Sequence, residues 1–242
     1  MRIRVAVVTR AREIPWDEVQ RPGRGLLYDL MREAAPDLGE QLHHSGLGPY
    51  GMVPFGYGSP VFPGAGRVRG IYAAGGAGTW EFGSPMPAVV EAFANGIASR
   101  TLLDWGGTAL RVQRIDLIEP PEFGTGRATF RTTTPVVMKG SGRDEHGVRT
   151  TRQAWLLPRD PEFPGYFTQN LRRKGATLGL GEEVQLDAIT AVGPKRSFAV
   201  KDGKKVGATV QVELSGDPAL LRAIWAFGLG QNNAAGFGWV AG

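Results

Sequence analysis

Two groups of residues have types and spacings that could support chemistry: four glycines near the C-terminus and three histidines. The last fifteen residues read GLGQNNAAGFGWVAG, and only four of them follow Gly238. A dinucleotide-binding glycine motif must open a helix inside a βαβ unit, so this position excludes that function. Glycine readily adopts positive φ, and the exposed N–H groups of such a loop could bind an anion. Glycines at the end of a chain also serve hairpins, and both interpretations stay open for Gly228, Gly230, Gly236 and Gly238.

The histidines do not form a metal-binding pattern. The chain has no cysteine, which excludes disulfides, thiolate catalysis and cysteine-based zinc sites. His43 and His44 are adjacent and His146 lies far along the chain. Neighbouring residues on a helix point about 100° apart, so His43 and His44 would not easily share one ion. We therefore expect chemistry without a metal and without a cofactor.

The charge balance suits an anionic partner. The net charge is +5, the isoelectric point is about 9.7, and 22 of the 28 basic residues are arginine. Arginine matches phosphate oxygens with two donors and stacks on bases, which favours nucleic acid. A GC-rich genome produces the same bias without selection for binding. Each basic cluster could likewise be an ordinary solvated surface: Lys139 and Arg143; Arg172, Arg173 and Lys174; Lys195 and Arg196.

Nothing in the sequence indicates a membrane. The N-terminus, MRIRVAVVTR, has too short an apolar run for a signal peptide, and no stretch reaches the length of a membrane span. We expect a cytoplasmic protein.

The elements that must position these residues follow a repeated order. In the first half, alternation and helical periodicity predict a strand, a helix interrupted by Pro36, a short strand near 52–57, two strands joined through AAGGAG, a helix and a strand. Their ranges are 3–8, 22–41, 70–74, 79–82, 85–99 and 110–118. This β-α-β-β-α-β order is the ferredoxin-like arrangement.

The second half repeats that order. A strand is followed by a hairpin, a helix, two strands, a capped helix and a closing strand. Their ranges are 127–133, 134–150, 160–174, 183–192, 205–214, a helix from 217, and 236–240. The predicted fold is α+β, with two tandem ferredoxin-like (RRM-like) βαββαβ modules, residues 1–119 and 120–242, and a C-terminal glycine-rich loop.

Three stretches, in order along the chain, carry a family resemblance. GQNNAAGFGWV is similar to a terminal glycine loop, ATFRTTTPVVMKGSG to the segment that opens a second module, and Gly25-Leu26-Leu27-Tyr28 with Leu42-His43 to a helix motif with fifteen positions from Tyr28 to His43. Together they resemble the Cas6 family of CRISPR RNA-processing endoribonucleases.

The resemblance implies a site. His43 would be the principal general acid or base, since the ordinary pKa of histidine is about 6.5. Tyr28 would orient the 2′-hydroxyl or bond to the phosphate, and His44 could replace His43 if the register differs by one. The products would be a 2′,3′-cyclic phosphate and a 5′-hydroxyl. Without the resemblance, Tyr28 would be a core residue and His43 would interact with its helix dipole.

One departure from the family concerns the catalytic cation. Some members place a lysine shortly after the active histidine, but this sequence has no lysine or arginine between Arg32 and Arg67. Lys139 is then the candidate cation.

The resemblance also implies the partner, CRISPR repeat RNA. The hairpin 134–150 is expected to grip the stem of the repeat, and the basic clusters and the glycine loop to contact its phosphates. No run of aromatic residues typical of an RRM is present, so stacking of bases on a sheet face is not expected.

Two other functions stay open. A catalytically silent relative would serve as an RNA-binding subunit of a CRISPR effector complex, with other subunits as partners, and the chain could form an oligomer. A small-molecule enzyme whose glycine loop holds a nucleotide would need a carboxylate pair, a P-loop lysine or metal ligands, none of which the sequence shows.

Overall fold

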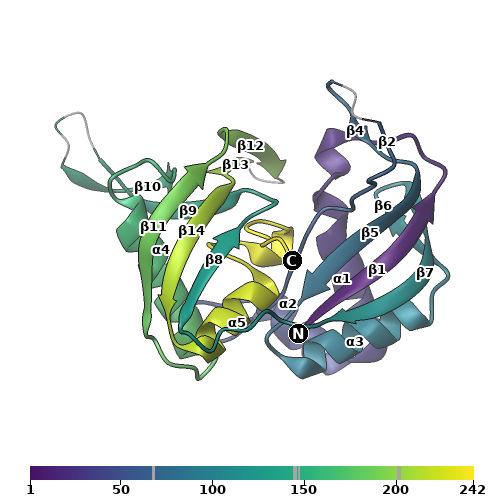
Figure 1. Ribbon diagram of the computed structural model, residues 1–242, viewed down its shortest axis with the longest axis horizontal. Coiled ribbons are helices and arrows are strands. Elements are labelled where there is room, and N and C mark those ends of the chain that lie inside the picture. Colours follow the sequence, from purple (N-terminus) through teal and green to yellow (C-terminus); the bar gives the residue numbers. More distant parts are fainter. Residues whose placement is uncertain (67–68, 144–145, 147, 201–202) are drawn as a thin grey trace. The chain divides into compact units, whose positions relative to one another are not determined.

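The computed structural model describes residues 1–66, 69–143, 146, 148–200 and 203–242. These residues form two compact units, each with its own sheets and helices (Figure 1). The first unit comprises Met1–Pro120 and Ala234–Gly236, and the second comprises Pro121–Asn233 and Phe237–Gly242. No helix in the described part of the chain is long and apolar enough to cross a membrane.

The first unit is built on a five-stranded antiparallel sheet. Its order is β3-β5-β1-β7-β6, with bounds Gly56–Tyr57, Gly76–Gly83, Arg2–Thr9, Thr108–Ile118 and Leu102–Trp105. The central strand β1 alternates as the sequence predicts, so that Ile3, Val5 and Val7 are buried while Arg4 is exposed. The order β7-β1-β5-β3 is that of a ferredoxin-like module.

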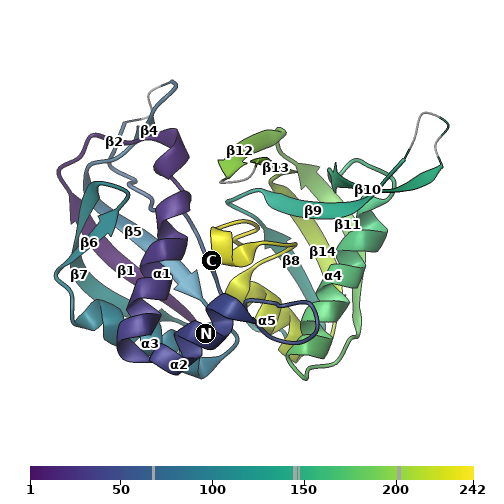
Figure 2. The ribbon, with the colours of Figure 1, turned by 180° about the vertical axis from the view of Figure 1, so that it is seen from behind.

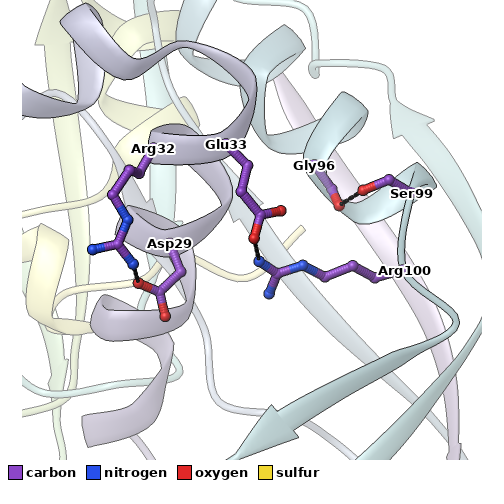
Figure 3. Close-up of polar contacts among 6 residues, drawn as sticks. All are labelled: Asp29, Arg32, Glu33, Gly96, Ser99 and Arg100. Atoms are coloured by element: carbon purple, nitrogen blue, oxygen red, sulfur yellow. Dashed lines mark hydrogen bonds and ion pairs between the residues drawn. The ribbon is translucent and has the colours of Figure 1, made fainter.

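Three helices accompany this sheet. They are α1 (Arg21–Ala34), α2 (Pro36–His44) and α3 (Pro87–Ala98), after a short 3-10 helix η1 (Trp16–Glu18). α1 and α3 pack on each other, and Gly96 of α3 permits this because a Cβ there would lie 3.0 Å from Leu30. Arg100, just after α3, forms an ion pair with Glu33 of α1 (Figure 3). This pair connects the ends of the two helices.

Local pairing in the first unit differs from the prediction at two places. The segments 70–74 and 79–82 do not pair with each other. Instead β4 (Tyr72–Ala73) pairs with β2 (Glu13–Ile14), and β5 pairs with β1 and β3. The strand β6 was not predicted, although a Gly-Gly pair between two short strand-like runs is typical of a two-residue hairpin turn. Those residues, Gly106 and Gly107, both have positive φ, as tight hairpins require.

The second unit contains the other ferredoxin-like module. Strands β8 (Arg127–Arg131), β14 (Val210–Gly216) and β11 (Val184–Val192) form one antiparallel sheet. Its helices are α4 (Phe163–Thr177) and α5 (Pro218–Phe227), and Asp217 caps α5 by accepting bonds from two backbone N–H groups. The predicted closing strand 236–240 is reduced to a single bridge between Val240 and Thr132. A 3-10 turn η2 (Asn233–Ala235) precedes that bridge.

Two insertions build a further sheet in the second unit (Figures 1 and 2). Strands β9 (Val136–Arg143) and β10 (Arg149–Leu156) lie between β8 and α4 in the chain, and β12 (Arg196–Val200) and β13 (Gly203–Ala208) lie between β11 and β14. The sheet order is β10-β9-β13-β12. The predicted hairpin 134–150 is therefore longer, and the predicted strand 205–214 divides at Thr209 into strands of two different sheets.

Candidate functional site

The corner between α1 and α2 places His43 beside Tyr28. α1 stops at Ala34 because Pro36 excludes helical geometry from the preceding residue, and the same proline occupies the first position of α2. Gly39 lets α2 approach α1 closely, since a Cβ there would lie 3.3 Å from Met31. Buried Leu42 anchors the end of α2. Its neighbour His43 faces the half-buried Tyr28, which lies in the middle of α1 between the buried Leu27 and Leu30.

The three predicted catalytic side chains lie together. The Tyr28 and His43 rings meet edge to face with their centroids 4.9 Å apart, and His43 and His44 meet in the same way at 4.9 Å. The Tyr28 hydroxyl donates a long bond of 3.4 Å to the carbonyl of Leu42. Both histidines are exposed, whereas Tyr28 also packs against the ring of Phe55. A tyrosine hydroxyl and an imidazole can thus act on one substrate from one surface.

A cation that the sequence analysis missed adjoins these rings. The guanidinium carbon of Arg24 lies 5.7 Å from the centre of the Tyr28 ring. The other two arginines of α1 bind carboxylates instead: Arg21 pairs with Glu18, and Arg32 pairs with Asp29 (Figure 3). A signal for Arg24 was present in the sequence, because it precedes Tyr28 by four residues and therefore shares its helix face.

Burial affects the proton chemistry of Tyr28. Partial desolvation raises its pKa above the ordinary value near 10, while the Arg24 charge acts in the opposite direction. Tyr28 therefore stays protonated at neutral pH and can donate a hydrogen bond. In the described part of the chain, no three His, Cys, Asp or Glu side chains gather as a metal-binding group.

Several N–H groups of the glycine-rich segment, residues 228–238, are already bonded within the protein. Gly228, Gly230, Gly236 and Gly238 all have positive φ, as the sequence predicts. However, the N–H groups of Leu229, Gln231 and Gly238 donate to the carbonyls of Gly238, Val137 and Pro135 at 2.9–3.0 Å. Donors that are already bonded inside the second unit cannot bind a phosphate without breaking these contacts. The prediction that this loop offers its N–H groups to RNA is therefore wrong for Leu229, Gln231 and Gly238.

The prediction that Lys174 contacts RNA is also wrong. It is buried in the second unit, where its ammonium donates to the Gly228 carbonyl and the Asn233 side-chain oxygen, both at 2.7 Å. It also lies 4.3 Å from the centre of the Phe227 ring. Asn233 in turn donates to the carbonyls of Leu229 and Phe237 at 2.9 Å. A lysine enclosed in this way holds the glycine-rich segment and does not face RNA.

The other predicted basic residues occupy different places in the second unit. Arg172 and Arg173 are exposed on α4, and Lys195 and Arg196 are exposed at the start of β12. Lys139 is exposed on β9, with its ammonium 5.0 Å from the centre of the Trp155 ring. Arg143 ends β9, and its side chain lies outside the described residues. Lys139, the predicted catalytic cation, thus belongs to the second unit, whereas Tyr28 and His43 belong to the first.

Comparison with known proteins gives both a family match and fold matches. Residues 118–241, just over half of the chain, match the family model described as CRISPR associated protein Cas6, C-terminal. No curated protein matches the sequence. The solved structure of a Cas6-related gene product from Pyrococcus furiosus is 14% identical, covers 100% of this chain and 97% of its own, and has a TM-score of 0.78.

Two further structures share the fold over the whole chain. One is described as an RAMP protein binding different RNA substrates. It is 16% identical in sequence, the match covers 99% of this chain and 98% of that chain, and the TM-score is 0.78. The other is described as a Cas6 product complex. It is 16% identical in sequence, the match covers 99% of this chain and 98% of that chain, and the TM-score is 0.67. The predicted architecture of tandem ferredoxin-like modules is confirmed by these likenesses.

Proposed function

The chain belongs to the Cas6 family of CRISPR-associated proteins, and from this premise we propose that it is a metal-independent endoribonuclease that binds CRISPR repeat RNA and cleaves precursor crRNA. The description of one similar structure as a product complex supports a processing role, and that of another as an RNA-binding protein supports the partner. The observation that carries the proposal is the group of Tyr28, His43 and Arg24 on one surface.

In the proposed reaction, the 2′-hydroxyl of the substrate attacks the adjacent phosphorus. The new P–O2′ bond forms as the P–O5′ bond breaks, giving a 2′,3′-cyclic phosphate and a 5′-hydroxyl. His43 transfers a proton: a neutral imidazole accepts it from the 2′-hydroxyl, and an imidazolium donates it to the leaving 5′-oxygen. The Tyr28 hydroxyl, whose pKa burial raises further above neutral, exchanges its long bond to the Leu42 carbonyl for a hydrogen bond to the substrate.

We assign the catalytic cation to Arg24 in place of Lys139. Negative charge accumulates on the non-bridging phosphate oxygens in the transition state, and a cation placed beside them stabilises that charge. Arg24 lies next to Tyr28 within the first unit. Its planar group can contact two phosphate oxygens at once.

The test is cleavage of the cognate repeat RNA in EDTA. Wild type should cut, whereas His43→Ala and a substrate with a 2′-deoxy sugar at the cut site should each abolish cutting while binding persists. His44→Ala, which changes the adjacent exposed histidine, is the matched control and should keep most of the activity. Undiminished cutting by His43→Ala would refute the assignment of His43. Binding without any cutting by wild type would instead establish the silent RNA-binding subunit.

A further inference from the structure

Four side chains from four strands of the second unit form one row across the sheet β10-β9-β13-β12. Trp155 of β10 pairs with Lys139 of β9, and Phe198 of β12 pairs with Lys205 of β13. β9 and β13 are joined in the register Gly207 to Val137. The paired positions end there, and continuing the same register by two residues along both strands places Lys205 opposite Lys139. We call these four residues, Trp155, Lys139, Lys205 and Phe198, the cross-strand row.

The row lies on the face of the sheet that α4 does not cover. α4 packs on β9, and a Cβ at Gly140 would lie 2.5 Å from Leu156 and 3.1 Å from Tyr166 of α4. Gly140 and Leu156 therefore face the helix. Because side chains alternate along a strand, their neighbours Lys139 and Trp155 face the opposite side.

Each lysine of the row lies near an aromatic ring: Lys139 near Trp155 of the row, and Lys205 near Phe237, which is outside it. The Lys139 ammonium lies 5.0 Å from the centre of the Trp155 ring, and the Lys205 ammonium lies 5.7 Å from that of Phe237. The Lys205 ammonium also donates to the side-chain oxygen of Asn232, which uses one of its three donors. The Phe237 ring meets Phe198 edge to face at 5.3 Å. Lys139 is exposed, and Trp155, Lys205 and Phe198 are half-buried, so each presents part of its surface.

We propose that the cross-strand row binds single-stranded RNA, with bases stacked on Trp155 and Phe198 and phosphates contacted by Lys139 and Lys205. Three inter-strand spacings separate the two aromatic ends, a span of about 14 Å. A four-stranded sheet of similar width stacks about two or three bases in RRM domains. Lysines alternating with aromatic rings complement a chain whose phosphates alternate with bases. The inference rests on the proposed function for its partner, RNA, and extends it to a surface away from the catalytic residues.

This proposed mode of binding differs from an expectation made from the sequence. Stacking on a sheet face was not expected, because no run of aromatic residues is present. The row is instead assembled from positions 139, 155, 198 and 205, which only the pairing of two separate insertions brings together.

The experiment measures binding of a labelled oligouridylate of about 12 nucleotides by fluorescence anisotropy over a range of salt concentrations. All proteins carry His43→Ala so that the probe stays intact. Trp155→Ala should weaken binding by about 5- to 100-fold with an unchanged salt slope, because it removes stacking. Trp155→Phe should recover most of that loss. Lys139→Gln should lower the slope of log K against log salt by about 0.7, because it removes one phosphate contact.

Trp16→Ala is the matched control, since Trp16 is an aromatic residue of the first unit that is 56% exposed. It should bind the probe as the parent does. If Trp155→Ala and Lys139→Gln both leave affinity and salt slope unchanged, the row does not bind RNA and the inference is wrong. A parent that binds no probe also overturns the inference. Cleavage of repeat RNA is measured separately with proteins that keep His43. It reports on the proposed function alone.

Discussion

At the residue scale, the three arginines of α1 differ in what their guanidinium groups contact. Arg21 and Arg32 each pair with a carboxylate three residues away. Arg24 instead lies over the Tyr28 ring, where its charge opposes the rise in the pKa of the tyrosine that burial causes. A guanidinium has five N–H donors, so the contact of Arg24 with Tyr28 leaves others for a phosphate. This difference makes Arg24 and Arg32 a matched pair for mutation.

Arg24→Gln should reduce the single-turnover cleavage rate by about 100-fold, the usual cost of removing one donor that stabilises transition-state charge. Arg24→Lys should recover part of that rate, because lysine keeps the charge but lacks the planar fork. Arg32→Gln, which changes a cation paired with Asp29, should cut at nearly the wild-type rate. An equal effect of Arg24→Gln and Arg32→Gln would show that only the overall charge of the helix matters.

The pH dependence separates the roles of Tyr28 and His43. Because burial raises the pKa of Tyr28 above its ordinary value near 10, the phenol does not ionise between pH 5 and 9. Tyr28→Phe should therefore lower the cleavage rate without moving the midpoints of the pH–rate profile in that range. Rates of both proteins measured across these pH values provide the test. Loss of a titrating limb in Tyr28→Phe would mean that the phenol itself transfers the proton.

At the element scale, the glycine-rich segment acts through its packing. Gly238 has a φ of +68°, and a Cβ there would lie 1.9 Å from the carbonyl oxygen of Leu229. Gly238→Ala should lower the free energy of unfolding by at least about 3 kcal/mol, from left-handed strain and steric overlap. Gly124→Ala, in the same unit with open space around it, should change it by less than about 1 kcal/mol. Denaturant unfolding measures both, and similar values for the two variants would contradict this packing.

The burial of Lys174 between α4 and the glycine-rich segment should make the free energy of unfolding depend on pH. Burial lowers the pKa of Lys174 to about 7. Below pH 7 the ammonium is charged in both states, and the folded state bears the full cost of burying it. From pH 7 to about 10.5 only the unfolded chain holds this proton, so stability rises with pH, by at most about 5 kcal/mol.

Lys174→Met lacks this titration and supplies the comparison. The unfolding free energy of wild type minus that of Lys174→Met should increase as the pH rises from 7 to 10. Urea unfolding of both proteins at several pH values measures the difference. A constant difference would indicate that Lys174 stays charged, held by its two acceptors and the Phe227 ring.

Sequence periodicity predicted the helices and strands that bury one face in a core. It predicted less well the strands that have no such buried face. The buried leucines of α1 and the alternation of β1 identify both elements, and Pro36 correctly marks the boundary with α2. The strand β12 was missed, and β13 was predicted only as part of a strand over 205–214, because both are defined by pairing with each other and with a distant insertion. The pairing of Tyr28 with His43 was predicted from the family resemblance. Arg24 could have been predicted only by asking which residues share the helix face of Tyr28. Enclosure of Lys174 depends on three-dimensional packing that the sequence does not show.

At the scale of the whole molecule, the chain repeats one module and varies it by insertion. The first unit carries Tyr28 and His43 on helices outside its sheet, and the second adds a four-stranded sheet between its ferredoxin-like elements. A fold repeated in this way lets one copy hold the proposed catalytic groups while the other provides additional surface. Cations of the second unit then fall on two sides of its inserted sheet, those of α4 on one and those of β12 on the other.

That separation predicts which cations contact RNA. Arg196 shares its strand face with Phe198, two residues away, and so lies on the side of the cross-strand row. Arg172 is exposed on α4, which packs on the opposite side of β9. Arg196→Gln should therefore lower the salt slope of single-stranded RNA binding by about 0.7, and Arg172→Gln should leave it unchanged. The two variants remove the same charge, so a nonspecific effect of the net charge of +5 would lower both slopes alike. Only a defined RNA path over the inserted sheet separates them, and a lowered slope for Arg172→Gln alone would move that path to α4.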